Sequence, residues 1–254
     1  MNHRLIRLVC IVLLLIGCAS RSSYQDKQNH VDTLEYFNRI MFNFNYNIMD
    51  PYLMRPVAVV WRNNMPQPIR NGLSNFFNNL EEPASMINSF LIGDPYKAMK
   101  HFNRFFLNTL LGMGGFIDVA VIVNPKLIKE IPYRFGSMLG YYYIGYGPYI
   151  VLPVYGSMTL RQDVGKWVDT LYPMLSYLKF WMFTGKWILE EIEIRAQLLD
   201  SDSLLRNSSD PYQIVRDAYF QHYDFLADNS ALSNKVNLNA LAIQDDLQSI
   251  DSSY

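Results

Sequence analysis

The chain has 254 residues, a formal net charge of −1 and few charged side chains, which make up 18% of the residues against the usual quarter. Aromatic residues reach 15%. This balance excludes the strongly basic surface typical of nucleic-acid binding. It suits the headgroup zone of a membrane, where Tyr and Trp place their rings in lipid and their polar tips in water, or else an aromatic-rich soluble core.

The N-terminus has the pattern of a lipoprotein leader. Arg4 and Arg7 form a positive region, residues 8–16 are apolar but too few to span a bilayer, and Leu15-Ile16-Gly17-Cys18 is a lipobox. We expect cleavage before Cys18 and acylation of that cysteine; an uncleaved membrane helix is the alternative. The acyl chains contribute about 0.8 kcal/mol per buried methylene, so the anchor is stable.

Loss of this leader defines the mature chain. The basic count falls from 22 to 20 against 23 acidic residues, a net charge of about −3. Because Cys10 is removed and Cys18 is acylated, no thiol remains for a disulfide, a nucleophile or zinc. Ala19 replaces the Asp that commonly retains lipoproteins at the inner membrane, which favours the outer membrane. The expected parts are a signal peptide at 1–17, a flexible tether at 18–31, one helical domain at 32–228 and a polar tail at 229–254.

Apolar residues recur at helical spacing and period-two strands are scarce, which predicts an all-α fold. The first helix carries Leu34, Phe37, Met41, Phe44 and Ile48 on one face. Three Asp-Pro pairs should each open a helix, because Asp caps free amides and Pro fits the first turn. They are Asp50-Pro51, Asp94-Pro95 and Asp210-Pro211. Capping boxes predict two further starts, at Asp32 with Glu35 and at Thr159 with Gln162.

Basic residues form one stripe and one isolated site. The stripe, at helical spacing, consists of Lys97, Lys100, His101 and Arg104, and the opposite face carries Met99, Phe102, Phe106 and Leu110. Such a helix suits the phosphates of a membrane surface, or else a solvated face paired with Glu81 or Glu82. Lys186 lies among aromatic residues, which is typical of a lysine whose stem is buried in lipid and whose ammonium reaches the headgroups. The alternative is an ordinary surface lysine.

One segment lacks charge altogether. Residues 135–160 contain no Asp, Glu, Lys or Arg, but five glycines and two prolines. So many helix breakers argue against a membrane-spanning helix. Irregular backbone at membrane depth survives only where protein covers it or a water-filled cavity lies beside it. The segment is therefore either an irregular hairpin or loop that lines a pore, or a buried core loop.

Catalytic machinery is scarce. The mature histidines, His30, His101 and His222, form no pair at metal-ligand spacing. Ser137 lies one position away from the Gly-x-Ser-x-Gly pattern of hydrolases, and no strand is expected before it. We therefore expect no enzyme, no metal and no cofactor. A surface phospholipase remains the rival, and it would need a reactive Ser or His.

Short motifs spread over almost the whole chain form one pattern. They lie at 35–39, Asp50-Pro51, 55–58, Asn75-Phe76, Asn79-Leu80, Pro83, Arg104-Phe105, Asn108, 112–118, Phe135-Gly136, 145–149, Leu152-Pro153 and 161–163. Together they resemble the MlaA (VacJ) family of outer-membrane phospholipid-transport lipoproteins. Thr33 and Ser157 stand where many members have Pro, at expected helix starts.

The resemblance implies a ring of amphipathic helices in the inner leaflet of the outer membrane, around a central amphipathic channel. It also implies association with trimeric porins and delivery of mislocalised outer-leaflet phospholipid to a periplasmic carrier protein. A phospholipid that leaves the bilayer exposes about 30 methylenes, on the order of 25 kcal/mol. A protein can lower this barrier without chemistry by giving the tails apolar contact and the headgroup a polar passage.

Within that picture, residues 135–160 form part of the passage. Gly145 and Gly147 are the expected hinges, and they permit Tyr141, Tyr143 and Tyr149 to shift. The expected headgroup contacts are Lys186, Lys97, Lys100 and Arg104. The alternative is a porin-associated structural lipoprotein without a lipid path of its own.

Overall fold

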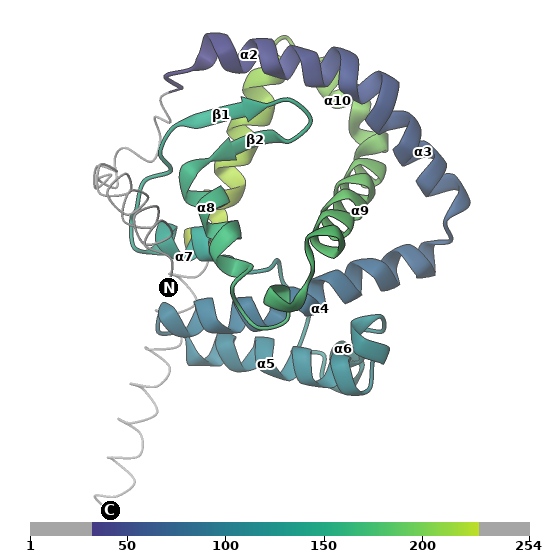
Figure 1. The fold of residues 1–254 in the computed structure, drawn as a ribbon, viewed down its shortest axis with the longest axis vertical. Helices are drawn as coiled ribbons and strands as arrows, with labels where there is room; N and C mark the ends of the chain where they lie inside the picture. The colour runs from purple at the N-terminus through teal and green to yellow at the C-terminus, as the bar shows by residue number, and fades with distance from the viewer. Residues whose placement is uncertain (1–31, 229–254) are drawn as a thin grey trace, which may run out of the picture.

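The computed structural model describes residues 32–228, which are mostly helical (Figure 1). The long elements are α2 Glu35–Phe44, the π-helical η2 Asn45–Met54, α3 Arg55–Asn64, α4 Gln67–Leu91, α5 Pro95–Leu110, α8 Leu160–Asp169, α9 Phe180–Leu198 and a helix over residues 211–228. The short helices are η3 Met113–Gly115, α6 Val119–Val123, α7 Phe135–Tyr141, η4 Leu175–Tyr177, η5 Leu199–Ser201 and α10 Asp202–Arg206. The expected signal peptide, the acylated Cys18, the tether and the tail lie outside the described residues.

These elements follow one another around a ring in Figure 1. The arc α2, η2 and α3 lies opposite the packed pair α4 and α5, and α9 packs along α3. The first helix meets the start of the last one, because Arg39 of α2 binds both carboxylate oxygens of Asp210 at 3.1 and 2.7 Å. This contact places α2 beside the start of the C-terminal helix and closes the ring.

The Asp-Pro pairs give two correct helix starts and one wrong one. Asp94 caps α5 by accepting the amide of Lys97 at 2.9 Å, and Asp210 accepts that of Gln213 at 3.2 Å. Asp50-Pro51 instead lies inside the continuous run of α2, η2 and α3. Pro51 has no N–H to donate and its ring needs room, and the wider π-helical turns of η2 accommodate both.

Neither capping box forms. Helix α2 begins after Leu34, and Asp32 accepts from the backbone of Leu34 at 3.2 Å and from the side chain of Asn38 at 2.8 Å. Helix α8 does begin after Thr159, but Asp163, one residue beyond Gln162, accepts the Thr159 amide at 2.9 Å. The predicted starts are therefore close to the observed ones, whereas the predicted capping bonds are wrong.

The charge-free segment contains the one departure from an all-helical fold within residues 32–228. After α7, the strands β1 Tyr149–Leu152 and β2 Gly156–Thr159 pair antiparallel, with Tyr149 opposite Thr159. Tyr149 and Val151 pack with Tyr212 and Phe220 in an apolar cluster. The all-α prediction is thus corrected to a mostly helical fold with one hairpin, because strands of four residues are too short for periodicity to reveal.

Candidate functional site

The described part of the chain places many polar side chains inside and many apolar ones outside. Its buried polar set includes Asn38, Glu81, Glu82, Asn88, His101, Arg104, Asn108, Asp169 and Lys186. Its exposed set is rich in large apolar residues, among them Tyr36, Tyr52, Leu110, Trp167, Tyr177 and Trp181. Extended apolar surface marks a membrane or partner contact. The distribution is therefore inverted relative to a water-soluble domain.

Helix α5 shows this inversion most clearly. Phe106 and Leu110 are 50% and 64% exposed, whereas Arg104 is 3% exposed. The sequence correctly separated the two faces of this helix. The expected orientation of the basic face was wrong, because Arg104 and His101 point into the protein and the apolar face points out.

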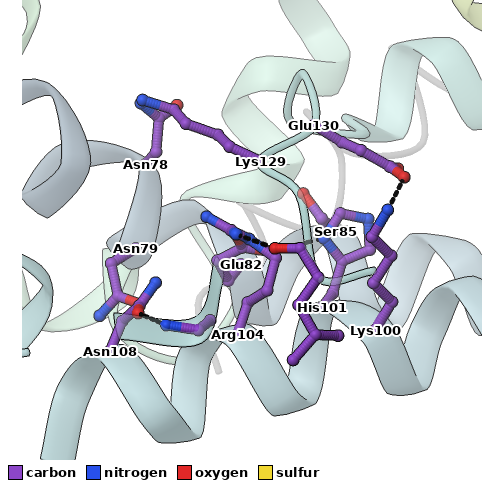
Figure 2. A network of polar contacts seen from close by, with 12 residues as sticks. Asn78, Asn79, Glu82, Ser85, Lys100, His101, Arg104, Asn108, Lys129 and Glu130 are labelled. Atoms are coloured by element: carbon purple, nitrogen blue, oxygen red, sulfur yellow. Dashed lines mark hydrogen bonds and ion pairs between the residues drawn. The ribbon is translucent and has the colours of Figure 1, made fainter. Parts of the chain in front are cut away.

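The inward face of α5 forms a charged network with α4 (Figure 2). Glu82 accepts from Arg104 Nε at 2.8 Å and lies 2.6 Å from His101 Nδ1. Arg104 also pairs with Asp118 at 3.2 Å, and Asn108 donates to the same carboxylate at 3.0 Å. Burial by itself lowers the pKa of Arg104, but the hydrogen bond and charge of Glu82 outweigh burial, and the pKa is raised. Arg104 is therefore held as a buried cation and does not present itself to headgroups.

The two lysines of the stripe are half-buried. Lys100 forms an ion pair with Glu130 of the loop before α7, and Lys97 lies 4.4 Å above the ring of Tyr133. Both contacts join α5 to the segment that leads into α7. Of the two acidic partners expected for the stripe, Glu82 does pair with it, through His101 and Arg104. The pairing of Lys100 with Glu130 was not expected.

A second charged cluster surrounds Lys186, which is 7% exposed. Its ammonium lies 2.6 Å from Glu81 of α4 and 2.7 Å from Glu190, one turn further along α9. Arg134 also binds Glu81, at 3.0 Å. Burial by itself raises the pKa of Glu81, but Arg134 and Lys186 outweigh it and lower that pKa. Lys186 therefore joins α4 to α9, and the expectation of a snorkelling side chain is wrong.

The hinge glycines lie in the segment between α7 and β1. Gly147 has φ +72°, where L side chains are strained, and a Cβ there would lie 3.1 Å from Leu160. Tyr143 is exposed and Tyr141 is half-buried. Tyr149 is 3% exposed and packs in the apolar cluster. Tyr149 is thus enclosed by other side chains, unlike Tyr143, and its movement with the hinge stays a prediction.

Sequence reasoning missed the residue that anchors this segment. Tyr146, between the two glycines, donates to Asp224 at 2.7 Å and lies 3.6 Å beneath the guanidinium of Arg161. Its carbonyl accepts the Arg161 amide at 3.1 Å. The glycines thus flank a fixed point. The sequence feature that could have pointed to this contact is Arg161, which follows the charge-free segment directly. It does not reveal that Arg161 stacks on Tyr146.

The described residues combine exposed apolar side chains with buried ion pairs. In the range 32–228, no group of three or more His, Cys, Asp or Glu side chains is placed to hold a metal. No helix of that range combines the length and apolar character needed to cross a membrane. Ser137 is buried within the short helix α7, not on a strand-to-helix turn.

Comparison with known proteins identifies close relatives. The family model "MlaA lipoprotein" matches residues 30–226. Proteins described as "Intermembrane phospholipid transport system lipoprotein MlaA" from Shigella flexneri and Escherichia coli (strain K12) are each 62% identical over 252 residues, covering 99% of this chain and 100% of the relative. The Haemophilus influenzae protein of that description is 40% identical over 226 residues, 87% of this chain and 88% of the relative.

A solved structure agrees with these relatives. It is described as "Structural basis for maintenance of bacterial outer membrane lipid asymmetry" and has a TM-score of 0.76 at 69% identity. The match covers 78% of this chain and 100% of the other.

Proposed function

Because the chain belongs to the MlaA lipoprotein family, we propose that it removes mislocalised phospholipids from the outer leaflet of the outer membrane and passes them to a periplasmic carrier protein. It is a phospholipid-transport lipoprotein and not an enzyme, and its activity maintains the lipid asymmetry of the outer membrane.

The protein is anchored through the acyl groups of Cys18, and the ring lies in the inner leaflet with its apolar outer surface among the acyl chains. The observation that carries this proposal is the inversion of α5, whose exposed Phe106 and Leu110 oppose the buried Arg104. The same apolar surface offers a contact area for trimeric porins. No nucleic acid takes part.

Lipid passes through an amphipathic channel inside the ring. The protein lowers the barrier of about 25 kcal/mol by keeping the tails in contact with apolar groups while the headgroup moves along polar ones. Gly145 and Gly147 act as the hinges of the channel wall, and Tyr141 and Tyr143 move with them. Lys97 and Lys100 contact the phosphates by exchanging the ring of Tyr133 and the carboxylate of Glu130 for the headgroup. Arg104 and Lys186 maintain the frame.

The experiment that tests this function is a strain that lacks the protein, scored for phospholipid on the cell surface. We expect the surface phospholipid to rise, to return to normal with the wild-type chain, and to stay high with Cys18→Ser. Equal surface phospholipid with and without the protein would contradict the proposal.

Photo-crosslinking separates the function from its rival. A photoreactive side chain at Tyr143 should capture phospholipid, whereas the exposed position Asn64, on α3, serves as the control. Capture of porin alone would favour a structural lipoprotein without a lipid path.

A further inference from the structure

Lys129 is a half-buried cation without a carboxylate partner in the described part of the chain. It lies in the loop that leads from α6 to α7, and Figure 2 shows its side chain extended toward Asn78 of α4. Its ammonium contacts two neutral oxygens, the hydroxyl of Ser74 at 3.4 Å and the side-chain carbonyl of Asn75 at 3.2 Å. Lys186, by contrast, is paired with two carboxylates. The charge of Lys129 is therefore not neutralised by a direct ion pair.

Burial destabilises this unpaired charge. It holds the pKa of Lys129 below its usual range, and the more distant charges of Asp118 and Glu82 oppose the shift only in part. Both carboxylates are themselves bound by Arg104, at 3.2 and 2.8 Å. The ammonium is thus desolvated without being paired, and an anion placed against it would favour the charged form.

The backbone on both sides of Lys129 is fixed. Two residues before it, the carbonyl of Leu127 accepts from Arg104 at 2.5 Å, and directly after it Glu130 forms an ion pair with Lys100. Both contacts tie the loop to α5. The side chain of Lys129 therefore extends from a held position, which reduces the entropy lost when it binds a ligand.

Two hydrogen-bond donors converge at this point. An ammonium carries three N–H groups, so the two contacts of Lys129 leave one of them available. The hydroxyl of Ser74 accepts from Lys129 and from Asn78, both at 3.4 Å, and it donates to no acceptor in the described part of the chain. A phosphate oxygen accepts hydrogen bonds from both kinds of donor. The site therefore suits an anion.

Apolar side chains flank the site. Ile128 and Ile131, which lie before and after Lys129 in the same loop, are 60% and 50% exposed. A free phosphate ion gains nothing from apolar contact, whereas the acyl chains of a phospholipid do. The combination of a cation with apolar neighbours favours a lipid headgroup over a free anion.

The site also lies close to the charged cluster around Lys186. Ser74, Asn78 and Glu81 occupy positions i, i+4 and i+7 of α4 and therefore lie on one face of that helix. Glu81 binds Lys186 of α9 at 2.6 Å. The Lys129 site is thus continuous with the polar face through which α4 meets α9.

We propose that Lys129, together with the hydroxyl of Ser74, binds the phosphate of a phospholipid headgroup. The proposal rests on the proposed function, because it names a point at which the transported lipid is held. Lys100 has to leave Glu130 to reach a phosphate, whereas Lys129 gives up no ion pair. Lipid binding at Lys129 therefore needs less rearrangement than binding at the lysines of α5.

The first test measures lipid binding directly. Purified full-length lipoprotein in uncharged dodecyl maltoside micelles is titrated with dihexanoyl phosphatidylglycerol, and native mass spectrometry gives the bound fraction. Lys129→Gln should bind this lipid about tenfold more weakly than wild type, the factor that corresponds to one lost charge-assisted hydrogen bond. Lys129→Arg, which keeps the charge, should bind nearly as wild type does. Equal binding by wild type and Lys129→Gln would overturn the site.

Two controls separate phosphate binding from other effects. Lys126→Gln removes the same charge at an exposed position of the same loop and should bind the lipid as wild type does. Equal losses in Lys126→Gln and Lys129→Gln would show an effect of net charge alone and overturn the site. Dihexanoylglycerol, which lacks the phosphate, should bind equally to wild type and Lys129→Gln. Weaker binding of this lipid to Lys129→Gln would assign the residue a structural role instead.

Inorganic phosphate distinguishes the two sources of the ligand. Added at the concentration of the lipid, it should leave the bound lipid in place, because it makes no apolar contact. Displacement of the lipid at that concentration would identify free phosphate as the ligand and overturn the assignment to a headgroup. Lys129→Gln should melt close to the temperature of wild type, since it loses only two long hydrogen bonds to neutral oxygens.

The last test measures the role of the site in transport. In cells that lack the native protein, Lys129→Gln should leave surface phospholipid above the normal level, while Lys126→Gln restores it to normal. Weaker lipid binding together with normal surface phospholipid would overturn the role in transport. A wild-type chain that failed to clear surface phospholipid would instead contradict the proposed function, and the binding data would still decide whether the site exists.

Discussion

The pair α4 and α5 and the hairpin are held in opposite ways. Between α4 and α5, buried charges meet one another, as Glu82 does with Arg104 and His101. In the hairpin, neutral amides of Asn38 and Asn45 meet backbone groups. Removing one partner of a buried ion pair is far more destabilising than removing a neutral hydrogen bond. The first region is thus suited to a rigid frame, whereas the hairpin is held by individually weaker contacts.

The comparison also explains where the polar residues go. When the outer surface of a ring lies in acyl chains, burying apolar side chains in its interior adds little stability, because lipid is as apolar as Leu. Polar contacts such as those of Glu82 and Lys186 then specify how helices meet. In the proposed location, the same logic leaves the exposed Phe106 and Leu110 facing acyl chains.

The largest expected effect comes from breaking the frame. Glu82→Leu removes the partner of Arg104 and His101 and leaves a buried cation without its closest carboxylate, which should lower the free energy of unfolding by about 3–5 kcal/mol. Urea unfolding in micelles measures it. Glu35→Leu, which removes an exposed partner of Arg39, should cost about 1 kcal/mol or less. Equal losses in the two variants would contradict a buried charged frame.

The next effect concerns the outer surface. Phe106→Glu, in an unacylated chain carrying Cys18→Ser, should weaken binding to neutral vesicles by roughly 30-fold, because a carboxylate among acyl chains costs about 2 kcal/mol. Asn103→Glu adds the same charge at an exposed polar position of α5 and should bind more nearly as the parent does. Vesicle co-sedimentation measures both, and identical binding would place α5 outside the lipid.

A smaller effect is expected at the hinge. Gly147→Leu forces a side chain at φ +72° against Leu160 and should cost about 1–2 kcal/mol while stiffening the segment. Surface phospholipid in cells should rise. Gly156→Leu has a similar φ of +85° but open space around it, and it should retain transport. If Gly147→Leu and Gly145→Leu both cleared phospholipid normally, the hinge would be wrong.

The smallest expected effect depends on pH. Burial raises the pKa of Asp169 to about 6, although Asn88 and the Phe135 amide oppose the shift. The folded state therefore binds this proton more tightly than the unfolded chain, so stability falls as pH rises from about 4 to 6. Between pH 5 and 7.5, wild type should lose about 1 kcal/mol relative to Asp169→Asn. The control Asp200→Asn, at an exposed position, should show the same dependence of stability on pH as wild type. Parallel stability curves for wild type, Asp169→Asn and Asp200→Asn would exclude the effect.

Local signals predicted part of this fold. At Asp94 and Asp210 the capping residue, the proline and the helix start are neighbours in the chain, so the sequence contains all that decides the outcome. At Asp50 the side chain instead binds Arg195, 145 residues away, through both carboxylate oxygens at 2.6 and 2.9 Å. No local pattern reveals such a partner, and the helix continues through the proline.

The site was harder to predict for a related reason. Helical spacing separates the two faces of α5, but which face is buried depends on whether the solvent is water or lipid. The same ambiguity affected Lys186, whose aromatic neighbours fit a snorkelling lysine although Glu81 and Glu190 bury it. Asn38 and Asn45 gave no signal as hairpin ligands, since their partners are backbone groups of a distant strand.

The depth of the outer face in lipid tests the central claim most directly. Residues 18–254 contain no cysteine except Cys18, so a chain of these residues with Cys18→Ser and Phe106→Cys has one labelling site for an environment-sensitive fluorophore. In vesicles containing phospholipids brominated on their acyl chains, the label at position 106 should shift to the blue and be strongly quenched, whereas a label at Asn103 should be quenched less. A label at 106 that fluoresces as in water and escapes quenching would contradict the account.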